Sequence, residues 1–476
     1  MTDRAPLNAP DAALLEKISA LLGPQGVKRP EDAPGFLEEP RGRWEGKAAV
    51  IARPAGTEEV SALVKLCAGA RVGIVPWSGG TGLVLGQIVK DGPAPVLLSL
   101  DRMTRIRESL PDEDALIVDA GVTLADAQKA AEAAGRLFPL SLASEGSCRI
   151  GGNLATNAGG VQVLRYGNAR DLCLGVEAVL PDGSVLHGLK TLRKDNTGYD
   201  LRHLLIGSEG TLGIITGAAL KLVPRPEESA TAFCAVPGPE AALALLHHLR
   251  ARFGETVSAF ELMSRQGFAF EAEHCPEVQL PIETPDWAVL AEVSGAAGAQ
   301  MQERLESALE EAMEAELVLD AALANSLAQR EKMWMVREML PEANRRVGAV
   351  SSHDVSVPLT RIAGFIEVVT AAIAGIDPGL RVNCFGHLGD GNLHYNVFPA
   401  QGRSRGDYAD QREAIKRCVH DLVHQMGGSH SAEHGVGRLK TEDLKRYSDP
   451  AKLSAMRAIK AALDPLGIMN PGAVLD

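Results

Sequence analysis

The sequence lacks the features of secreted, membrane-spanning and nucleic-acid-binding proteins. Its seven cysteines are odd in number and form no CxxC pair, which argues for a reducing compartment and against a disulfide framework. No uninterrupted apolar run of about eighteen residues suggests a membrane span. The formal charge of −13 disfavours nucleic acid as a partner, because phosphate contacts require a concentrated basic surface.

The beginning of the chain has no apolar core behind a basic head. We therefore expect residues 1–42 to form a polar lead-in with an amphipathic helix and not a secretory signal. No internal repeat or low-complexity tract follows. Together with the cysteine pattern, this favours a cytoplasmic protein that does not span a membrane.

With 476 residues, the chain is too long for one hydrophobic core. Short apolar runs alternate with helical stretches over residues 43–224, and the Pro-rich, charged stretch 224–229 marks the main boundary. A second domain is expected over 225–425 and a C-terminal segment over 426–476. The predicted strands are 48–54, 72–77 and 95–101. The predicted helices are 57–70, 123–134 (with Thr123 as N-cap), 239–253, 299–315, 362–373 and 410–426.

Four glycine clusters lie in the first half, at 78–82, 150–153, 157–160 and 207–213. The first follows a predicted strand, where glycine lets backbone N–H groups approach a pyrophosphate. A dinucleotide-binding Rossmann unit is excluded, because the residues between Gly86 and Pro95 are too few for the crossover helix. A P-loop is excluded because no lysine follows the glycines.

Two histidines flank an Asp-Gly pair in the run FGHLGDGNLHYNV. Asp-Gly between apolar residues predicts a hairpin with a two-residue type I′ turn. This register pairs His387 directly with His394 and places Asn396 on the same face.

Two imidazoles on one face of a hairpin can share a divalent ion. The run GGSHSAEHGVG supplies a carboxylate in a glycine-flanked loop, because Glu433 precedes His434. The residue types and the hairpin register therefore predict a metal site.

The runs PWSGGTGL, SEGSCRIGGNLATNAGG, RYG and LLIGSEGTLGIIT resemble the FAD domain of the vanillyl-alcohol-oxidase/p-cresol-methylhydroxylase superfamily. The resemblance implies an α+β protein: a two-subdomain FAD-binding domain, a substrate domain with an antiparallel sheet, and a C-terminal helical segment that returns to the FAD domain. It implies non-covalent FAD, because Thr81 stands where covalent members carry a histidine. The flavin-binding residues that it implies are Trp77, Ser78, Gly79, Gly80, Thr81, Gly82, Leu83, Ser144, Gly151, Gly152, Asn157, Gly160, Gly213 and Ile214.

The runs GHLGDGNLHYNV and SAEHGVG resemble the substrate domain of the D-2-hydroxyglutarate and D-lactate dehydrogenases. The resemblance implies a dehydrogenase that converts a D-2-hydroxy acid to the 2-oxo acid. Electrons would pass to an external acceptor, either electron-transfer flavoprotein, a quinone or oxygen; a homodimer stays open. The site residues that it implies are the metal ligands His387, His394 and Glu433 (commonly for zinc), the base His434, and the substrate contacts Arg337, Asn396 and Ser352.

Two positions depart from the D-2-hydroxyglutarate pattern. Pro341 and Ser352 stand where that branch has a threonine and a lysine, both of which help to hold the distal carboxylate. Losing a charged contact weakens the binding of a dianion unless another group replaces it, and His353 is a candidate. Without a replacement, a monocarboxylate such as D-lactate becomes more plausible as the substrate.

D-2-hydroxyglutarate is still ranked first, because GHLGDGNLHYNV resembles that branch more closely. The alternatives are a D-lactate dehydrogenase, a metal-free phenol-type flavin oxidase, and a flavin- or metal-binding subunit without activity. The combination of Arg337 with His434 favours an enzyme.

Overall fold

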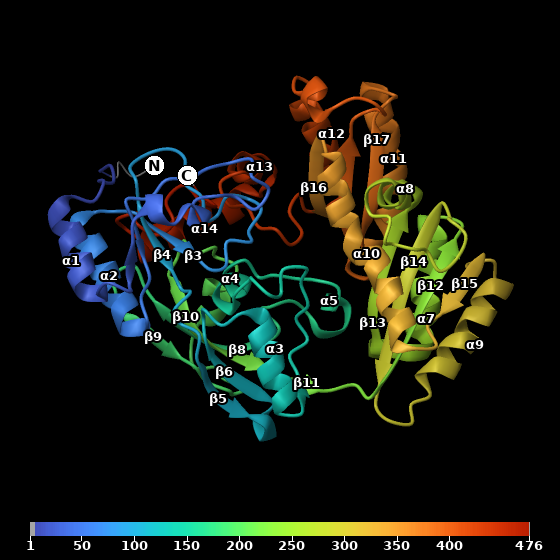
Figure 1. Ribbon diagram of the computed structural model, residues 1–476, viewed down its shortest axis with the longest axis horizontal. Coiled ribbons are helices and arrows are strands. Elements are labelled where there is room, and N and C mark those ends of the chain that lie inside the picture. The colour runs from blue at the N-terminus through green and yellow to red at the C-terminus, as the bar shows by residue number, and fades with distance from the viewer. Residues whose placement is uncertain (1–4, 476) are drawn as a thin grey trace. The chain divides into compact units, whose positions relative to one another are not determined.

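The computed structural model describes residues 5–475, which form two compact units (Figure 1). The first unit contains the chain up to Gly159, Gly167–Arg225 and the part from Glu433 onward. The second contains Gly160–Tyr166 and Pro226–Ala432. The chain thus passes into the second unit within the Pro-rich stretch 224–229 and returns to the first at Glu433.

The first unit is built on two sheets of different kinds. In the four-stranded sheet, of order β1-β2-β4-β3, β2 and β3 run parallel to β4. The five-stranded sheet, of order β5-β6-β10-β8-β9, is antiparallel. The strands are β1 (Val27–Lys28), β2 (Val50–Ala52), β3 (Ile74–Trp77), β4 (Val96–Ser99), β5 (Ile106–Leu110), β6 (Ala115–Asp119), β8 (Cys173–Val179), β9 (Val185–Gly188), β10 (Ile214–Lys221), and the separate pair β7 (Arg136–Leu137) and β11 (Val223–Pro224).

The C-terminal part of the chain packs within this first unit. Ile74 of β3 donates its N–H to the Ile468 carbonyl at 2.8 Å, and Asn470 donates to the Ile74 carbonyl at 2.8 Å. The helices are α1 (Ala12–Leu22), α2 (Thr57–Ala70), α3 (Leu124–Ala133), α4 (Ile150–Ala155), α6 (Leu201–Leu205), α13 (Thr441–Tyr447) and α14 (Pro450–Leu463).

The second unit is a seven-stranded antiparallel sheet with helices on both faces. Its order is β15-β12-β14-β13-β17-β18-β16, and the strands are β12 (Glu228–Val236), β13 (Val257–Ser264), β14 (Trp287–Gly295), β15 (Asp320–Leu323), β16 (Ser351–Ser356), β17 (Arg381–His387) and β18 (Asn392–Phe398). The core on one face includes α7 (Pro239–Phe253), α9 (Met301–Glu314), α11 (Ile362–Ile376) and α12 (Arg412–Gln425). The core on the other face includes α8 (Arg265–His274) and α10 (Leu327–Val347), while α5 (Val163–Tyr166) contacts β13.

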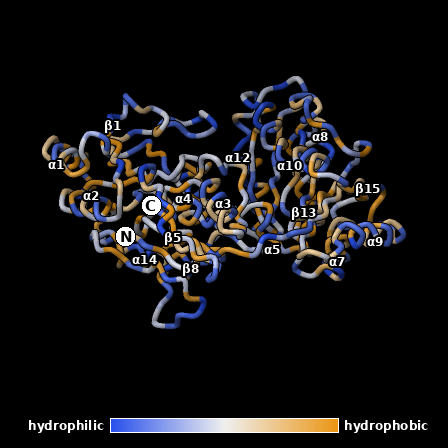
Figure 2. The backbone as a smooth tube through the Cα atoms, turned by 60° about the horizontal axis from the view of Figure 1, so that its bottom comes forward, coloured by the Kyte–Doolittle hydropathy of each residue, from blue (hydrophilic) through white to orange (hydrophobic). Residues whose placement is uncertain are grey.

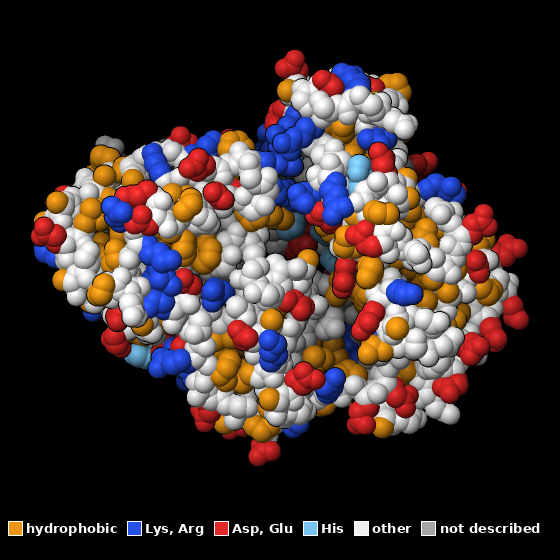
Figure 3. Space-filling view, viewed as in Figure 1, with side chains coloured by type: hydrophobic (Ala, Val, Ile, Leu, Met, Phe, Trp, Pro, Cys, Tyr) orange, Lys and Arg blue, Asp and Glu red, His pale blue; other side chains and the backbone are white. Residues whose placement is uncertain are grey.

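Most predicted elements are present. Helices α2 and α7 span the predicted residues, and the Thr123 side chain accepts the N–H of Asp126 at the start of α3. Hydrophilic and hydrophobic residues alternate along helix α9 (Figure 2). Acidic side chains line the edge of the second unit where α9 lies (Figure 3). The long helix α10 was not predicted, and it continues through Pro341.

One stretch of the described chain, Leu359–Ile376, is long and apolar enough to cross a membrane by length and composition alone. Arg361 and Glu367 lie within it. Its helical part, α11, buries Phe365, Val369 and Ile373 in the core that α11 shares with α7 and α12.

A carboxyl group is buried without a partner between α8 and its neighbours. Glu271 on α8 is only 2% exposed, and neither oxygen has a hydrogen-bond partner among residues 5–475. Burial raises the pKa of Glu271 to about 8, a shift that the positive charge of Arg337 only partly opposes. The folded chain therefore holds this proton at pH values where the unfolded chain has lost it.

We expect Glu271 to make the protein less stable as pH rises. A carboxyl with a raised pKa makes its full contribution to the free energy of unfolding below its ordinary pKa of 4.5. That contribution is lost as pH rises through about 8. Glu271→Gln, which stays neutral, should therefore become more stable than wild type across this range, by at most about 1.4 kcal/mol per pH unit. Urea denaturation from pH 5 to pH 8.5 measures the difference.

The control is Glu273→Gln, an exposed carboxylate on the same helix. A stability difference between wild type and Glu271→Gln that does not change with pH would contradict the prediction.

Candidate flavin and metal sites

The loop after β3 has the geometry of an anion cradle. Gly79 and Gly80 have φ values of 93° and 72°, which favour glycine. A Cβ on Gly79 would lie 2.4 Å from the carbonyl oxygen of Ser147, so no side chain fits there. No backbone N–H of residues 79–83 donates to another residue of the described chain. These N–H groups suit a phosphate or pyrophosphate, as FAD requires.

The second glycine cluster packs directly against the first. Gly151 and Gly152 lie in the first turn of α4, and Gly152 donates its N–H to Ser78 Oγ at 2.9 Å. A Cβ on Gly152 would lie 2.9 Å from the Ser78 carbonyl oxygen. Ser144 accepts the N–H groups of Ser147 and Cys148 through its carbonyl. These contacts bring the expected flavin-binding residues at 77–83, 144 and 151–152 together.

The remaining expected flavin residues, Asn157, Gly213 and Gly160, have different surroundings from one another. Asn157 has a φ of 53°, and its Oδ1 accepts the Arg170 N–H at 3.0 Å, so this amide oxygen is already used within the fold. Gly213 precedes Ile214, the first residue of β10, and a Cβ there would lie 2.9 Å from the Val179 carbonyl. Gly160 belongs to the second unit.

The fourth cluster contains a carboxylate that the sequence did not single out. Glu209 is buried, and its oxygens accept the N–H groups of Val436 and Gly437, each at 2.7 Å. Burial raises the pKa of Glu209, and the two N–H groups oppose that shift. Glu209 therefore holds the backbone just after His434. Its partners lie 227 and 228 residues away along the chain, so no local pattern indicates them.

The predicted hairpin forms, but with a different turn and register. The link is a 3-10 turn over Leu388–Asp390 followed by Gly391 at φ 85°, not a two-residue type I′ turn. As a result, His394 pairs with Phe385, and not with His387 as expected. The pairing is shifted by two residues, which leaves every side chain on its predicted face because strand faces alternate with a period of two.

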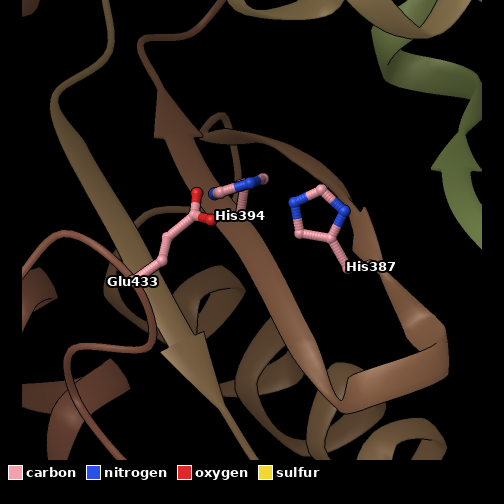
Figure 4. Close-up of side chains that lie close together, drawn as sticks. All are labelled: His387, His394 and Glu433. Carbon is pink, nitrogen blue, oxygen red and sulfur yellow. The ribbon is translucent and has the colours of Figure 1, made fainter. Parts of the chain in front are cut away.

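His387 and His394 remain neighbours on that face. Their ring centroids lie 5.6 Å apart, and the ligand atoms of His387, His394 and Glu433 all lie within 4.8 Å of one another (Figure 4). Glu433 directly follows Ala432, whose N–H donates to the Asp354 carbonyl of β16 at 3.3 Å. Two imidazoles and a carboxylate at this spacing suit a divalent ion that accepts nitrogen and oxygen ligands.

A buried carboxylate connects His387 to Arg337. Glu261 on β13 is 1% exposed; its Oε1 lies 2.8 Å from His387 Nδ1, and its Oε2 accepts Arg337 Nε at 2.7 Å. Burial acts to raise the pKa of Glu261, but the charges of His387 and Arg337 outweigh it and lower the pKa well below its usual range. Glu261 was not predicted from the sequence, since its partners are 126 and 76 residues away.

Arg337 keeps part of its guanidinium available for a ligand. It is buried on α10 and lies over the Phe385 ring, 4.8 Å from the centroid. Glu261 uses only its Nε, and the two terminal nitrogens donate to no described residue. A guanidinium edge of this kind can bind a carboxylate through two hydrogen bonds.

The remaining predicted residues are His434, which lies in the loop after α12, and Asn396 and Ser352, which share one face of the sheet. His434 Nε2 lies 3.6 Å from Glu433 Oε1, and a second group of potential ligand atoms consists of Asp354, Glu433 and His434. Asn396 and the exposed Ser352 are paired across β18 and β16.

His353, considered as a replacement for the missing lysine, is on the wrong face. It is 3% exposed, and its Nδ1 lies 3.2 Å from His420 Nε2 in the opposite core. The strand period of two excludes it from the face of Ser352.

Two family models match separate parts of the chain. Residues 48–188 match the FAD binding domain family, and residues 225–474 match the family of FAD-linked oxidases, C-terminal domain. The chain belongs to the FAD-linked oxidase family. It is therefore an FAD-dependent oxidoreductase, as the sequence analysis expected.

Three relatives cover most of this chain. D-2-hydroxyglutarate dehydrogenase of Bos taurus is 37% identical over 98% of this chain and 83% of the relative. The enzyme of the same name from Xanthomonas citri pv. viticola is 34% identical, with 91% and 90% covered. A Schizosaccharomyces pombe protein that carries the name of a D-lactate dehydrogenase is 34% identical, with 93% and 84% covered.

A solved structure confirms the expected fold class. p-Cresol methylhydroxylase superposes with a TM-score of 0.75, 17% identity and 99% coverage of both chains.

The expected cytoplasmic location is wrong by this comparison. The names of the Bos taurus and Schizosaccharomyces pombe relatives place both proteins in mitochondria. The expectation rested on the cysteine pattern, which reports redox conditions. Unpaired cysteines cannot distinguish between compartments that are both reducing.

We expect Glu209→Gln to loosen the backbone at 436–437. An amide side chain has one acceptor oxygen, so one of the two N–H groups loses its partner and the other loses a charge-assisted bond. Hydrogen exchange at Val436 and Gly437 should accelerate by about 10-fold or more, since a bond to a charged group contributes about 1.5–3 kcal/mol.

Mass-spectrometric exchange on the flavoprotein makes the measurement. The control is Glu177→Gln, which changes a carboxylate bound to Arg107 and Thr57 in the same unit. Equal exchange at 436–437 in wild type and Glu209→Gln would contradict the assigned role.

Proposed function

We propose that this protein oxidises a D-2-hydroxy acid, with D-2-hydroxyglutarate ranked first, to the corresponding 2-oxo acid. The proposal includes non-covalently bound FAD, a divalent ion such as zinc at His387, His394 and Glu433, and an external electron acceptor. The observation that carries it is the cluster of these three side chains, together with Glu261, which joins His387 to Arg337.

Each side chain has a chemical task in this proposal. Arg337 binds the substrate carboxylate with its terminal nitrogens, which are free of other partners in the described chain. His434 takes the proton from the substrate hydroxyl, because a neutral imidazole nitrogen can accept a proton. When bound, FAD would supply the acceptor for the hydride that leaves Cα, and an ion held by His387, His394 and Glu433 would supply Lewis acidity toward the hydroxyl.

The choice between D-2-hydroxyglutarate and D-lactate depends on the distal end of the substrate. The relatives named above carry both activities in their names. In the row of paired residues Asn383, Asn396 and Ser352, no side chain is cationic. Asn383 is moreover used within the fold, because it donates to Asn344 Oδ1 and accepts from Ser264 Oγ.

The decisive experiment is anaerobic reduction of the bound flavin. D-2-hydroxyglutarate should bleach the visible flavin absorbance, and its L-enantiomer should not. Treatment with a chelator should abolish bleaching while the flavin stays bound, and added Zn²⁺ should restore it. His434→Ala should slow the reduction by about 10²–10⁴-fold, the usual contribution of a positioned base.

Three results would count against the proposal. A flavin that no D-2-hydroxy acid reduces would exclude the reaction. Full activity after removal of all metal would exclude the metal from it. Flavin that stays attached to acid-denatured protein would show covalent attachment and contradict the role of Thr81.

We expect Ser352→Lys to improve the use of D-2-hydroxyglutarate. A lysine on this exposed strand position, on the face of Asn396, adds a cationic contact for the distal carboxylate. The kcat/KM for D-2-hydroxyglutarate should rise about tenfold, equivalent to about 1.4 kcal/mol. D-lactate should gain nothing, because it has no second carboxylate.

Ser352→Gln is the matched control, since it adds length without charge. Equal gains from lysine and glutamine, or a wild-type preference for D-lactate, would favour the monocarboxylate alternative.

A further inference from the structure

Glu261 contacts two residues of the candidate site. Each of its oxygens binds a different site residue, Oε1 at 2.8 Å from His387 Nδ1 and Oε2 at 2.7 Å from Arg337 Nε. It is 1% exposed and does not belong to either group of potential metal ligands. Its position is fixed by the sheet, where β13 pairs Glu261 directly with His387 of β17.

We propose that Glu261 is a positioning residue that sets the metal ligand and the substrate arginine at the same time. This inference rests on the proposed function. Contact with Oε1 keeps the His387 proton on Nδ1, so that Nε2 is the nitrogen that faces the metal. Contact with Oε2 fixes the rotation of the Arg337 guanidinium, so that its two terminal nitrogens face the substrate carboxylate.

The neighbouring strand offers a carboxylate that anchors the same helix without contacting the site. Glu292 on β14 is 4% exposed and accepts Arg330 Nε at 2.8 Å and Trp334 Nε1 at 3.0 Å, both from α10. It also accepts the hydroxyl of Thr231 at 2.9 Å. Two carboxylates thus hold α10 on the sheet, and Glu261 differs by its bond to His387. Glu292→Gln therefore shows what a loss of anchoring alone does.

The test compares Glu261→Gln with Glu292→Gln in the full-length flavoprotein. Zn²⁺ affinity is measured by competition with a chromophoric chelator, and KM and kcat for D-2-hydroxyglutarate are measured at saturating Zn²⁺. Glutamine has one acceptor oxygen and cannot serve both donors. We expect Glu261→Gln to weaken Zn²⁺ binding by about 10–100-fold, the usual effect of losing such a partner. KM should rise several-fold while kcat at saturating metal falls less.

The control variant should behave differently. Glu292→Gln should lower the melting temperature and leave Zn²⁺ affinity and KM within about twofold of wild type. If Glu261→Gln does not fold, Glu261→Asp, which keeps the charge but shortens the reach, should show the same pattern of loss. Flavin content and circular dichroism report folding in each case.

Three results would overturn the inference. Unchanged Zn²⁺ affinity and KM in a folded Glu261 variant would show that the carboxylate positions neither residue. Equal losses in Glu292→Gln would assign the effect to displacement of α10. A wild-type protein that binds no Zn²⁺, or whose flavin the acid does not reduce, would overturn the proposed function and this inference with it.

Discussion

The two-residue period of a β-strand decides where the chemistry of the second unit lies. His387 of β17 and His394 and Asn396 of β18 all face α10, whereas Cys384 and Tyr395 face the opposite core. A shift of pairing by one residue would exchange these two sets, and the polar groups would be buried among apolar side chains. The same period separates Ser352 from its neighbour His353. Every further property of the site depends on this assignment of faces.

That constraint also explains which features the sequence predicted. Sequence patterns that span only a few residues were sufficient to predict helices α2, α3 and α7 and the sheet face that the two histidines share. The detailed register was not predictable, because it depends on how Leu388–Asp390 fold into a 3-10 turn. Helix α10 was obscured by Pro341, since proline removes a helical hydrogen bond and usually ends a helix. Burial of the apolar residues Met333, Val336 and Leu340 beneath it is what keeps the helix continuous.

Glu261 and Glu209 were missed for a different reason: their partners are distant in sequence, and each becomes recognisable only when strands or loops meet. The comparison of Glu261 with Glu271 shows what burial requires of a carboxyl group. With a histidine and an arginine in contact, the pKa of Glu261 is lowered despite burial. Glu271 has no hydrogen-bond partner in residues 5–475, and its pKa rises to about 8. Of these two acids beside α10, Glu261 is therefore the one that carries negative charge at neutral pH.

In the proposed reaction, one set of residues binds the reacting groups of the substrate and another set meets its variable tail. Every D-2-hydroxy acid has the same carboxylate and hydroxyl, and these are the groups that Arg337, His434 and the proposed metal ligands are suited to bind. The substrates differ in the tail, which in this proposal meets the row that ends at Ser352. Residues in this row are paired across strands, and the two oxygens of Glu261 bind His387 and Arg337 instead. A substitution at Ser352 can therefore change which acid is preferred while the reacting groups stay in place, since the Ser352 side chain forms no hydrogen bond with them in the described chain.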